Sequence, residues 1–160
     1  MDLQKLVRQN IISLKPYSSA RDEFSGEAGV FLDANENPFG DLNRYPDPHQ
    51  QTLKDKLKDI KKLTSKQVFI GNGSDEVIDL LIRIFCNPSV DKIIVCPPTY
   101  GMYEVAANIN DVMVLSVPLT QDFQLDTEAL QQVISQSEPN TLKLIFLCTP
   151  NNPTGNSIDN

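Results

Sequence analysis

The chain has 160 residues, 40% of them apolar and 22% charged, so it can bury a substantial core and its composition does not indicate disorder. The formal net charge of −7 argues against a nucleic-acid partner, because binding to a phosphate backbone needs a basic surface. No apolar run approaches the roughly 20 residues of a membrane span and the N-terminus has no signal-peptide pattern, so we expect a cytoplasmic protein.

The first 47 residues predict an irregular arm. A short helix is predicted at residues 2–9, and proline and glycine then interrupt the chain too often for long regular elements. From residue 48 the pattern changes to apolar runs with regular spacing. We therefore expect an N-terminal arm or small-domain segment at residues 1–47, and part of a larger folded domain at residues 48–160.

Residues 48–160 alternate between helical and strand-like patterns. The apolar spacing predicts helices at 48–63, 74–86, 100–109 and 126–135, and strands at 67–70, 92–96, 112–117 and 142–148. The helix at 74–86 has so many apolar positions that we expect most of it to be buried. Alternation of strands with helices of this length predicts an α/β fold, with a mainly parallel sheet and helices on both faces.

The last predicted strand, 142–148, is almost continuously apolar, with Lys143 as the exception. Such strands are typical of central positions with a neighbour on each side. Few residues follow it, so we expect the chain to form an incomplete large domain whose sheet has an exposed edge or takes further neighbours from elsewhere.

Cysteine and histidine residues do not indicate a metal site. The three cysteines have no C-x-x-C spacing and each ends an apolar run, which predicts reduced and mostly buried thiols. The single histidine, His49, follows a proline in a turn-like stretch without a second ligand type at a suitable spacing.

Three loops follow predicted strands, at the sheet end where open α/β folds bind ligands. The first, Gly71-Asn72-Gly73-Ser74-Asp75-Glu76, leads into a helix, whose free N–H groups can hold a phosphate. It is equally compatible with a plain strand–turn–helix connection that places acidic residues at the positive end of the helix. It is not a dinucleotide fingerprint, because Glu76 stands where the third glycine would be, and no G-K-[ST] follows as in a P-loop.

The other two loops offer an aromatic ring and an amide. Pro97-Pro98-Thr99-Tyr100 presents an aromatic side chain at the mouth of the sheet, or is simply a stiffened helix entry. Thr149-Pro150-Asn151-Asn152-Pro153-Thr154-Gly155 is a turn in which the amide of Asn152 can donate or accept hydrogen bonds. A phosphate cradle, an aromatic face and an amide together suit a phosphorylated planar ring such as pyridoxal phosphate.

These motifs carry a family resemblance. G-N-G-S-D-E, C-P-P-T-Y-G-M-Y and N-N-P-T-G, in this order, resemble the fold type I aminotransferases, which depend on pyridoxal 5'-phosphate. The upstream segments K-P-Y, L-D-A-N-E-N-P and R-Y-P-D, which begin at Lys15, Leu32 and Arg44, are similar to the histidinol-phosphate aminotransferases. The likeness covers the whole chain, which is a little under half of that family's usual length.

The resemblance implies a role for each residue that matches a motif. Gly73, Ser74 and Asp75 would hold the cofactor phosphate, Tyr100 would stack on the pyridine ring, and Asn152 would hydrogen-bond its phenolic oxygen. Tyr45 would reach the cofactor phosphate of the partner subunit, which makes the active site a property of a homodimer. Tyr17 and Asn35 would lie near the substrate.

The implied reaction moves an amino group from glutamate to imidazole-acetol phosphate, giving 2-oxoglutarate and histidinol phosphate in histidine biosynthesis. The family's Schiff-base lysine, the acid that pairs with the pyridine nitrogen and a substrate-binding arginine all lie beyond Asn152. Lys143 precedes the Asn-Pro-Thr-Gly turn and is no substitute. We therefore expect no catalytic residue among these 160 residues, and no activity from them alone.

Three other readings remain. An aromatic aminotransferase and an enzyme similar to threonine-phosphate decarboxylase share the cofactor loops with the histidinol-phosphate aminotransferases. A nucleotide-binding α/β module belongs to a different class, and the missing third glycine counts against it.

Overall fold

The computed structural model of the chain describes residues 3–19, 23–24, 30 and 32–159. The residues form two compact units, which are named here the sheet unit (Met1–Leu14 with Gly71–Asn160) and the arm unit (Lys15–Ile70). This grouping concerns contacts within the chain. The domain boundary expected between residues 47 and 48 stays a prediction.

The sheet unit contains a parallel sheet of three strands, in the order β2-β1-β3. These strands are β1 (Lys92–Val95), β2 (Met113–Ser116) and β3 (Leu142–Phe146). Ile93 of β1 lies opposite Val114 on one side and Leu144 on the other, with an irregularity in the β1–β3 pairing between Lys92 and Ile93. The predicted parallel α/β architecture is confirmed.

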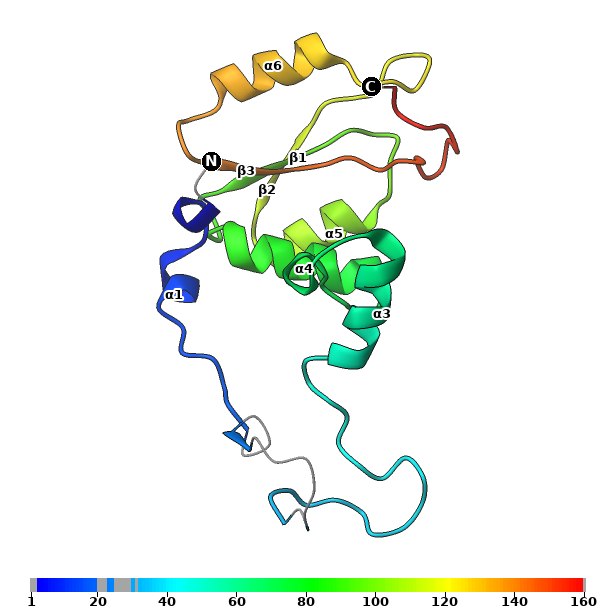
Figure 1. The fold of residues 1–160 in the computed structure, drawn as a ribbon. Coiled ribbons are helices and arrows are strands. Elements are labelled where there is room, and N and C mark those ends of the chain that lie inside the picture. Colours follow the sequence, from blue (N-terminus) through cyan, green and yellow to red (C-terminus); the bar gives the residue numbers. More distant parts are fainter. Residues whose placement is uncertain (1–2, 20–22, 25–29, 31, 160) are drawn as a thin grey trace. The chain divides into compact units, whose positions relative to one another are not determined.

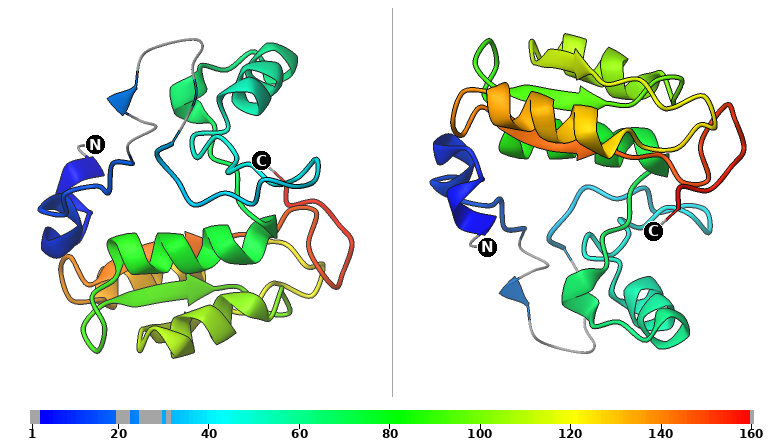
Figure 2. Two further views of the ribbon diagram at one scale, coloured as in Figure 1. Left: turned by 90° about the horizontal axis from the view of Figure 1, so that it is seen from below. Right: turned by 90° about the horizontal axis from the view of Figure 1, so that it is seen from above.

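Helices cover both faces of this sheet (Figure 1). Helices α4 (Gly73–Phe85) and α5 (Met102–Ile109) lie on one face, and α6 (Thr127–Gln136) lies on the other. The two views of Figure 2 look at these faces in turn, with α4 in front in one and α6 in front in the other.

The central strand explains this layering, because successive residues of a strand point to opposite faces. Ile93 and Val95 pack into a core cluster with residues of α4 and α5, whereas Ile94 packs with Leu130 of α6. Asp126 accepts a hydrogen bond from the backbone N–H of Ala129 at 2.9 Å and so caps the start of α6.

The N-terminal segment of the sheet unit contains η1 (Leu3–Lys5) and α1 (Gln9–Ile12). Between them, Arg8 donates from its backbone N–H to the carbonyl of Ile84 at 3.0 Å, and from its guanidinium to the carbonyl of Arg83 at 2.8 Å. Carbonyls at a helix C-terminus lack helical partners, so Arg8 satisfies two of them at the end of α4. The arm unit contains α3 (Gln51–Lys61) and η2 (Ser65–Gln67).

Two elements predicted within the N-terminal half of the chain, at residues 2–9 and 67–70, are wrong. Residues 67–70 do not form a strand, because a strand needs a neighbouring backbone and the described sheet consists of β1, β2 and β3 alone. The helix predicted at 2–9 is replaced over its described residues by η1 and then by α1, which starts only at Gln9; residue 2 lies outside the described residues.

One expectation about burial differs from the structure, and one about the sheet edge agrees with it. In α4 only Ile78 and Ile82 are fully buried, because the helix presents a single face to the sheet. Strand β3 pairs with β1 alone among the described residues, and its central position in a complete sheet stays a prediction. Its Ile145 side chain is 42% exposed, which agrees with the expectation of an exposed sheet edge.

All three cysteines are free, as expected; Cys86 and Cys96 are buried and Cys148 is partly buried. Burial raises the pKa of Cys86 to about 12, so its thiol stays protonated at neutral pH. Within the part of the chain that the structure describes, none of the helices has both the length and the apolar character that crossing a membrane requires.

Candidate functional site

Two loops and a helix start meet at one end of the sheet. Helix α4 runs back to the start of β1, so its N-terminus lies near the end at which β1 finishes. The hydroxyl of Tyr100, in the loop after β1, donates a hydrogen bond to Oδ1 of Asp75, in the first turn of α4, at 2.9 Å. The loop after β3 joins the same region, because Asn151 donates from its side chain to the carbonyl of Pro98 at 2.9 Å. We call the group formed by Asp75, Pro98, Tyr100 and Asn151 the sheet-end cluster.

The first turn of α4 is open to a ligand. Gly73 has a φ of +79°, in the left-handed region that favours glycine. Apart from its chain neighbours and the backbone of its own helix, no described atom lies within 4 Å of the position that a Cβ would occupy there. The residue before it, Asn72, makes no side-chain capping bond. The N–H groups of Gly73, Ser74 and Asp75 belong to the first helical turn, which has no helical acceptors. Such a turn can bind an anion.

Tyr100 packs against a pair of stacked aromatic side chains, Tyr103 and Phe146. The ring of Tyr103, in α5, meets the Tyr100 ring edge to face, with centroids 5.7 Å apart at an angle of 87°. Tyr103 in turn stacks on Phe146 of β3, with centroids 4.8 Å apart. The hydrogen bond to Asp75, some burial and the negative charge of Asp75 all raise the pKa of Tyr100. Tyr100 therefore stays a neutral hydrogen-bond donor at physiological pH.

Replacing Asp75 by asparagine in the protein that carries this segment is expected to lower the pKa of Tyr100. Asparagine keeps an acceptor oxygen but removes the charge that disfavours the phenolate. The raised pKa also makes a stabilising contribution that is complete below the pKa of an unfolded tyrosine and is lost as the pH rises through the folded-state value. The pKa is measured by NMR titration of the tyrosine ring carbons in the cofactor-free protein.

Tyr103 is the internal control for this titration, because burial is the main cause that raises its pKa to about 12. The charge of Tyr100 is the smallest of the causes that raise the Tyr103 pKa, so the Tyr103 titration should change much less than that of Tyr100 in Asp75→Asn. A Tyr100 pKa that stays the same or rises in this variant would contradict the assigned contact.

The loop after β3 places two neighbouring asparagines differently. Asn152, the residue predicted to bind the cofactor ring, is exposed and makes no hydrogen bond with the described residues, so its amide is available to a ligand. Asn151 is buried, with 4% of its surface exposed, and its side chain is fully hydrogen-bonded. Sequence reasoning did not single out Asn151. The only available signal was the doubled asparagine, since adjacent residues of an extended segment point to opposite sides.

The remaining predicted residues lie in the arm unit, where they line one pocket. Tyr17, Asn35 and Tyr45 face a cavity of about 920 Å³. The other lining residues include Ser19, Asp33, Ala34, Pro46, Asp47, Pro48 and His49. The structure thus gathers Gly73, Ser74, Asp75, Tyr100 and Asn152 in the sheet unit, and Tyr17, Asn35 and Tyr45 in the arm unit.

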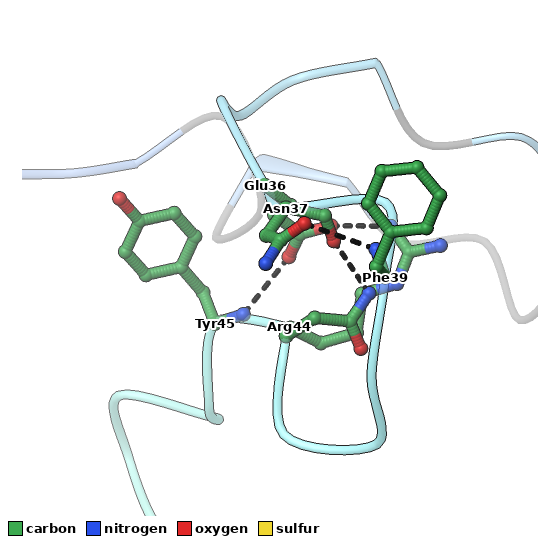
Figure 3. A network of polar contacts seen from close by, with 6 residues as sticks. Glu36, Asn37, Phe39, Arg44 and Tyr45 are labelled. Atoms are coloured by element: carbon green, nitrogen blue, oxygen red, sulfur yellow. Dashed lines mark hydrogen bonds and ion pairs between the residues drawn. The ribbon is translucent and has the colours of Figure 1, made fainter.

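Glu36 fixes the loop that carries Asn35 and Tyr45 (Figure 3). Its side chain, which is only 6% exposed, forms an ion pair with Arg44 and accepts a hydrogen bond from the backbone N–H of Tyr45 at 2.9 Å. The Tyr45 ring points away from this carboxylate and is largely exposed. Within the same loop, Asn37 accepts a hydrogen bond from the N–H of Phe39 at 3.0 Å. In the sequence this glutamate is one letter of the motif L-D-A-N-E-N-P, which carries no signal of its contacts.

Replacing Glu36 by alanine is expected to speed the hydrogen exchange of the Tyr45 amide by about tenfold or more, because a hydrogen bond to a charged acceptor is lost. Glu36→Gln keeps an acceptor and should have a smaller effect. The matched control is the amide of Gln51, which donates to Asp47 at 2.7 Å in the same unit and should not change. Equal acceleration at both amides would mean that the variant unfolds the whole arm unit. No acceleration at Tyr45 would contradict the role of Glu36 in holding the Tyr45 backbone.

Comparison with known proteins places this geometry in context. Residues 25–160 match the family model described as aminotransferase class I and II. The chain is 56% identical to a histidinol-phosphate aminotransferase of Parabacteroides distasonis, over 99% of this chain and 45% of that protein. It is 54% identical to a histidinol-phosphate aminotransferase of Cytophaga hutchinsonii, over 96% of this chain and 44% of that protein. The chain therefore spans a little under half the length of these relatives.

Solved structures give the same picture of the fold. The histidinol-phosphate aminotransferase from Clostridium acetobutylicum superimposes with a TM-score of 0.59 and 28% identity, over 74% of this chain and 32% of that chain. The enzyme of the same name from Sinorhizobium meliloti, solved in complex with pyridoxal-5'-phosphate, gives a TM-score of 0.61 at 21% identity, over 71% of this chain and 29% of that chain. At that identity the second likeness concerns the fold alone.

Proposed function

Because the chain belongs to the class I and II aminotransferase family, we propose that the protein carrying it is a histidinol-phosphate aminotransferase. The reaction proposed is the transfer of an amino group from glutamate to imidazole-acetol phosphate, with pyridoxal 5'-phosphate as cofactor, in the cytoplasm. The observation that carries the proposal is the sheet-end cluster, in which the open first turn of α4 and the Tyr100 ring meet the loop that carries Asn152. The identities of 56% and 54% to relatives with this name support the choice of substrate.

The residues present fit the cofactor. A phosphate group needs several N–H donors and room to approach them, and the first turn of α4 offers both around Gly73. A planar ring needs an aromatic or apolar face. Tyr100 offers one, and its ring is held by the edge-to-face contact with Tyr103. An oxygen on that ring needs a donor, and the Asn152 amide is exposed and not engaged elsewhere in the described chain.

Each residue has a distinct part in this proposal. The amides of Gly73, Ser74 and Asp75 bind the phosphate, Tyr100 covers the ring and Asn152 donates to its phenolic oxygen. When bound, the cofactor supplies an electron sink for the transfer of the amino group. The protein's part is to bind and orient it, and to keep the neutral hydroxyl of Tyr100 donating to Asp75.

The arm pocket completes the proposal. Tyr17 and Asn35 would contact the phosphorylated substrate, since both line the same cavity as Tyr45. Tyr45 would reach the cofactor phosphate of a second copy of the protein, so the enzyme would work as a homodimer. The hydrogen bond from the Tyr45 N–H to Glu36 would hold the Tyr45 backbone in place for this contact.

The test is an assay of the protein that carries this segment, saturated with pyridoxal phosphate and supplied with glutamate as donor. We expect kcat/KM for imidazole-acetol phosphate to exceed that for phenylpyruvate by about tenfold or more, because a site that binds a phosphate rejects an acceptor without one. Formation of 2-oxoglutarate and histidinol phosphate is followed together, so that donor and acceptor turnover can be matched.

Two results would redirect the proposal. Faster turnover of phenylpyruvate would make the protein an aromatic aminotransferase. Release of carbon dioxide from threonine phosphate, with no transfer from glutamate, would make it a decarboxylase. Failure of the protein to bind pyridoxal phosphate at all would contradict the proposal that this is its cofactor.

A further inference from the structure

Asn151 is an unusual residue for a loop, because it is buried between two exposed neighbours. Its Nδ2 donates to the carbonyl of Pro98 at 2.9 Å and to Oγ1 of Thr154 at 2.7 Å, and its Oδ1 accepts from Oγ1 of Thr99 at 3.1 Å. Burying an amide without partners would cost free energy, and here both ends of the amide are paired.

The backbone of Asn151 is fixed as well. Its N–H donates to the carbonyl of Asn156 at 2.7 Å, and its carbonyl accepts from the N–H of Gly155 at 2.7 Å. The segment from Asn151 to Asn156 is therefore a closed turn. Asn152 lies inside this turn, so its backbone position depends on that of Asn151.

The side chain of Asn151 also joins two loops. Among the described residues, the hydrogen bonds between the loop after β1 (residues 96–101) and the loop after β3 (residues 147–156) are those from Asn151 to Pro98 and from Thr99 to Asn151. One loop carries Tyr100 and the other carries Asn152. A change at Asn151 would thus let the two move independently.

We propose that Asn151 is a positioning residue of the cofactor site, which sets the spacing between Tyr100 and Asn152 without touching the cofactor. This inference rests on the proposed function. The residue type follows from the contacts, because a short side chain must present two donors and one acceptor at the same time. Aspartate keeps the acceptor and loses both donors, whereas leucine loses all three.

A double-mutant cycle separates positioning from simple structural support. The variants are Asn151→Ala, Asn152→Ala and both together, in the full-length protein, with pyridoxal phosphate as the ligand. The dissociation constant and the pH titration of the bound cofactor's absorbance are measured for each. We expect Asn152→Ala to weaken binding by about tenfold or more in the natural background. In the Asn151→Ala background the same change should weaken it by less than about threefold, because the ring contact is already misplaced.

Two milder variants keep the test informative if Asn151→Ala does not fold. Asn151→Asp preserves size and the acceptor, and Thr99→Val removes a single bond between the loops. Both should shift the absorbance titration of the cofactor in the same direction as Asn152→Ala, which a merely structural loss of stability would not do. The matched control is Asn108→Ala, an exposed asparagine in α5 whose side chain makes no hydrogen bond with the described residues, and it should change neither quantity.

Independent effects of Asn151→Ala and Asn152→Ala, whose fold-changes multiply in the double variant, would overturn the proposal. So would an unchanged titration in Asn151→Asp and Thr99→Val. An unmutated protein that binds no pyridoxal phosphate would instead overturn the proposed function, which this experiment therefore tells apart from the role of Asn151.

Discussion

Replacing Asn152 by alanine in the protein that carries this segment is expected to weaken pyridoxal phosphate binding by roughly 10- to 150-fold. This range corresponds to the loss of about 1.5–3 kcal/mol, which is the usual value of one hydrogen bond to a charged group. The side chain is exposed and makes no bond within the described chain, so its removal should leave the fold intact. The dissociation constant and the pH titration of cofactor absorbance are the measurements.

Asn152→Asp sharpens this prediction. Aspartate has the same size but turns a donor into a negatively charged acceptor, so it should bind the cofactor no better than the alanine variant. If both variants keep the natural affinity and an unchanged titration, Asn152 does not belong to the site.

The largest loss of stability is expected from Ile82→Ala. Ile82 in α4 is 0% exposed and packs in the cluster that joins α4, α5 and β1. Removing its buried methyl and methylene groups should lower the free energy of unfolding by about 2–5 kcal/mol. Denaturant titration of the full-length protein, followed by circular dichroism, measures this change.

Ile109→Ala is the matched control, because Ile109 lies in the neighbouring helix α5 and is 70% exposed. Its effect should stay within about 0.5 kcal/mol. Similar losses for the two variants would contradict the assignment of Ile82 to the core and Ile109 to the surface.

The regular elements of the sheet unit could be predicted from the sequence because local patterns determine them. The β-branched run that contains Ile93 and Ile94 predicts a buried strand, and the residues around Ile82 repeat with helical spacing. The predicted ends differ from the observed ones by only a few residues. These elements carry their signal within a few consecutive side chains.

What could not be predicted depends on partners far away in the sequence. The run at residues 67–70 has strand-like composition but pairs with no strand of the described sheet, and an apolar run does not say which strands are available beside it. The strand order β2-β1-β3 could not be predicted for the same reason. A periodic pattern reports which face of an element is apolar, not what covers that face.

The candidate site divides in the same way. Asn152 and Tyr100 were identified because they stand in short motifs at strand ends, where ligands bind. The roles of Asn151 and Glu36 became apparent only from their contacts, since both act on backbone groups that the sequence does not pair with them. Residues that touch a ligand often have a motif, whereas residues that hold them in place need not.

The strand order β2-β1-β3 also determines when the sheet can form as the chain leaves the ribosome. Once Ser116 has emerged, β1 and β2 can pair through α5, but the other edge of β1 has no partner until Phe146 is made. An unpaired edge with apolar residues is a template for pairing with another chain. While residues 117 to 146 are being made, this edge of β1 can therefore mispair with a neighbouring nascent chain on the same messenger RNA, and a chaperone that shields strand edges would prevent it.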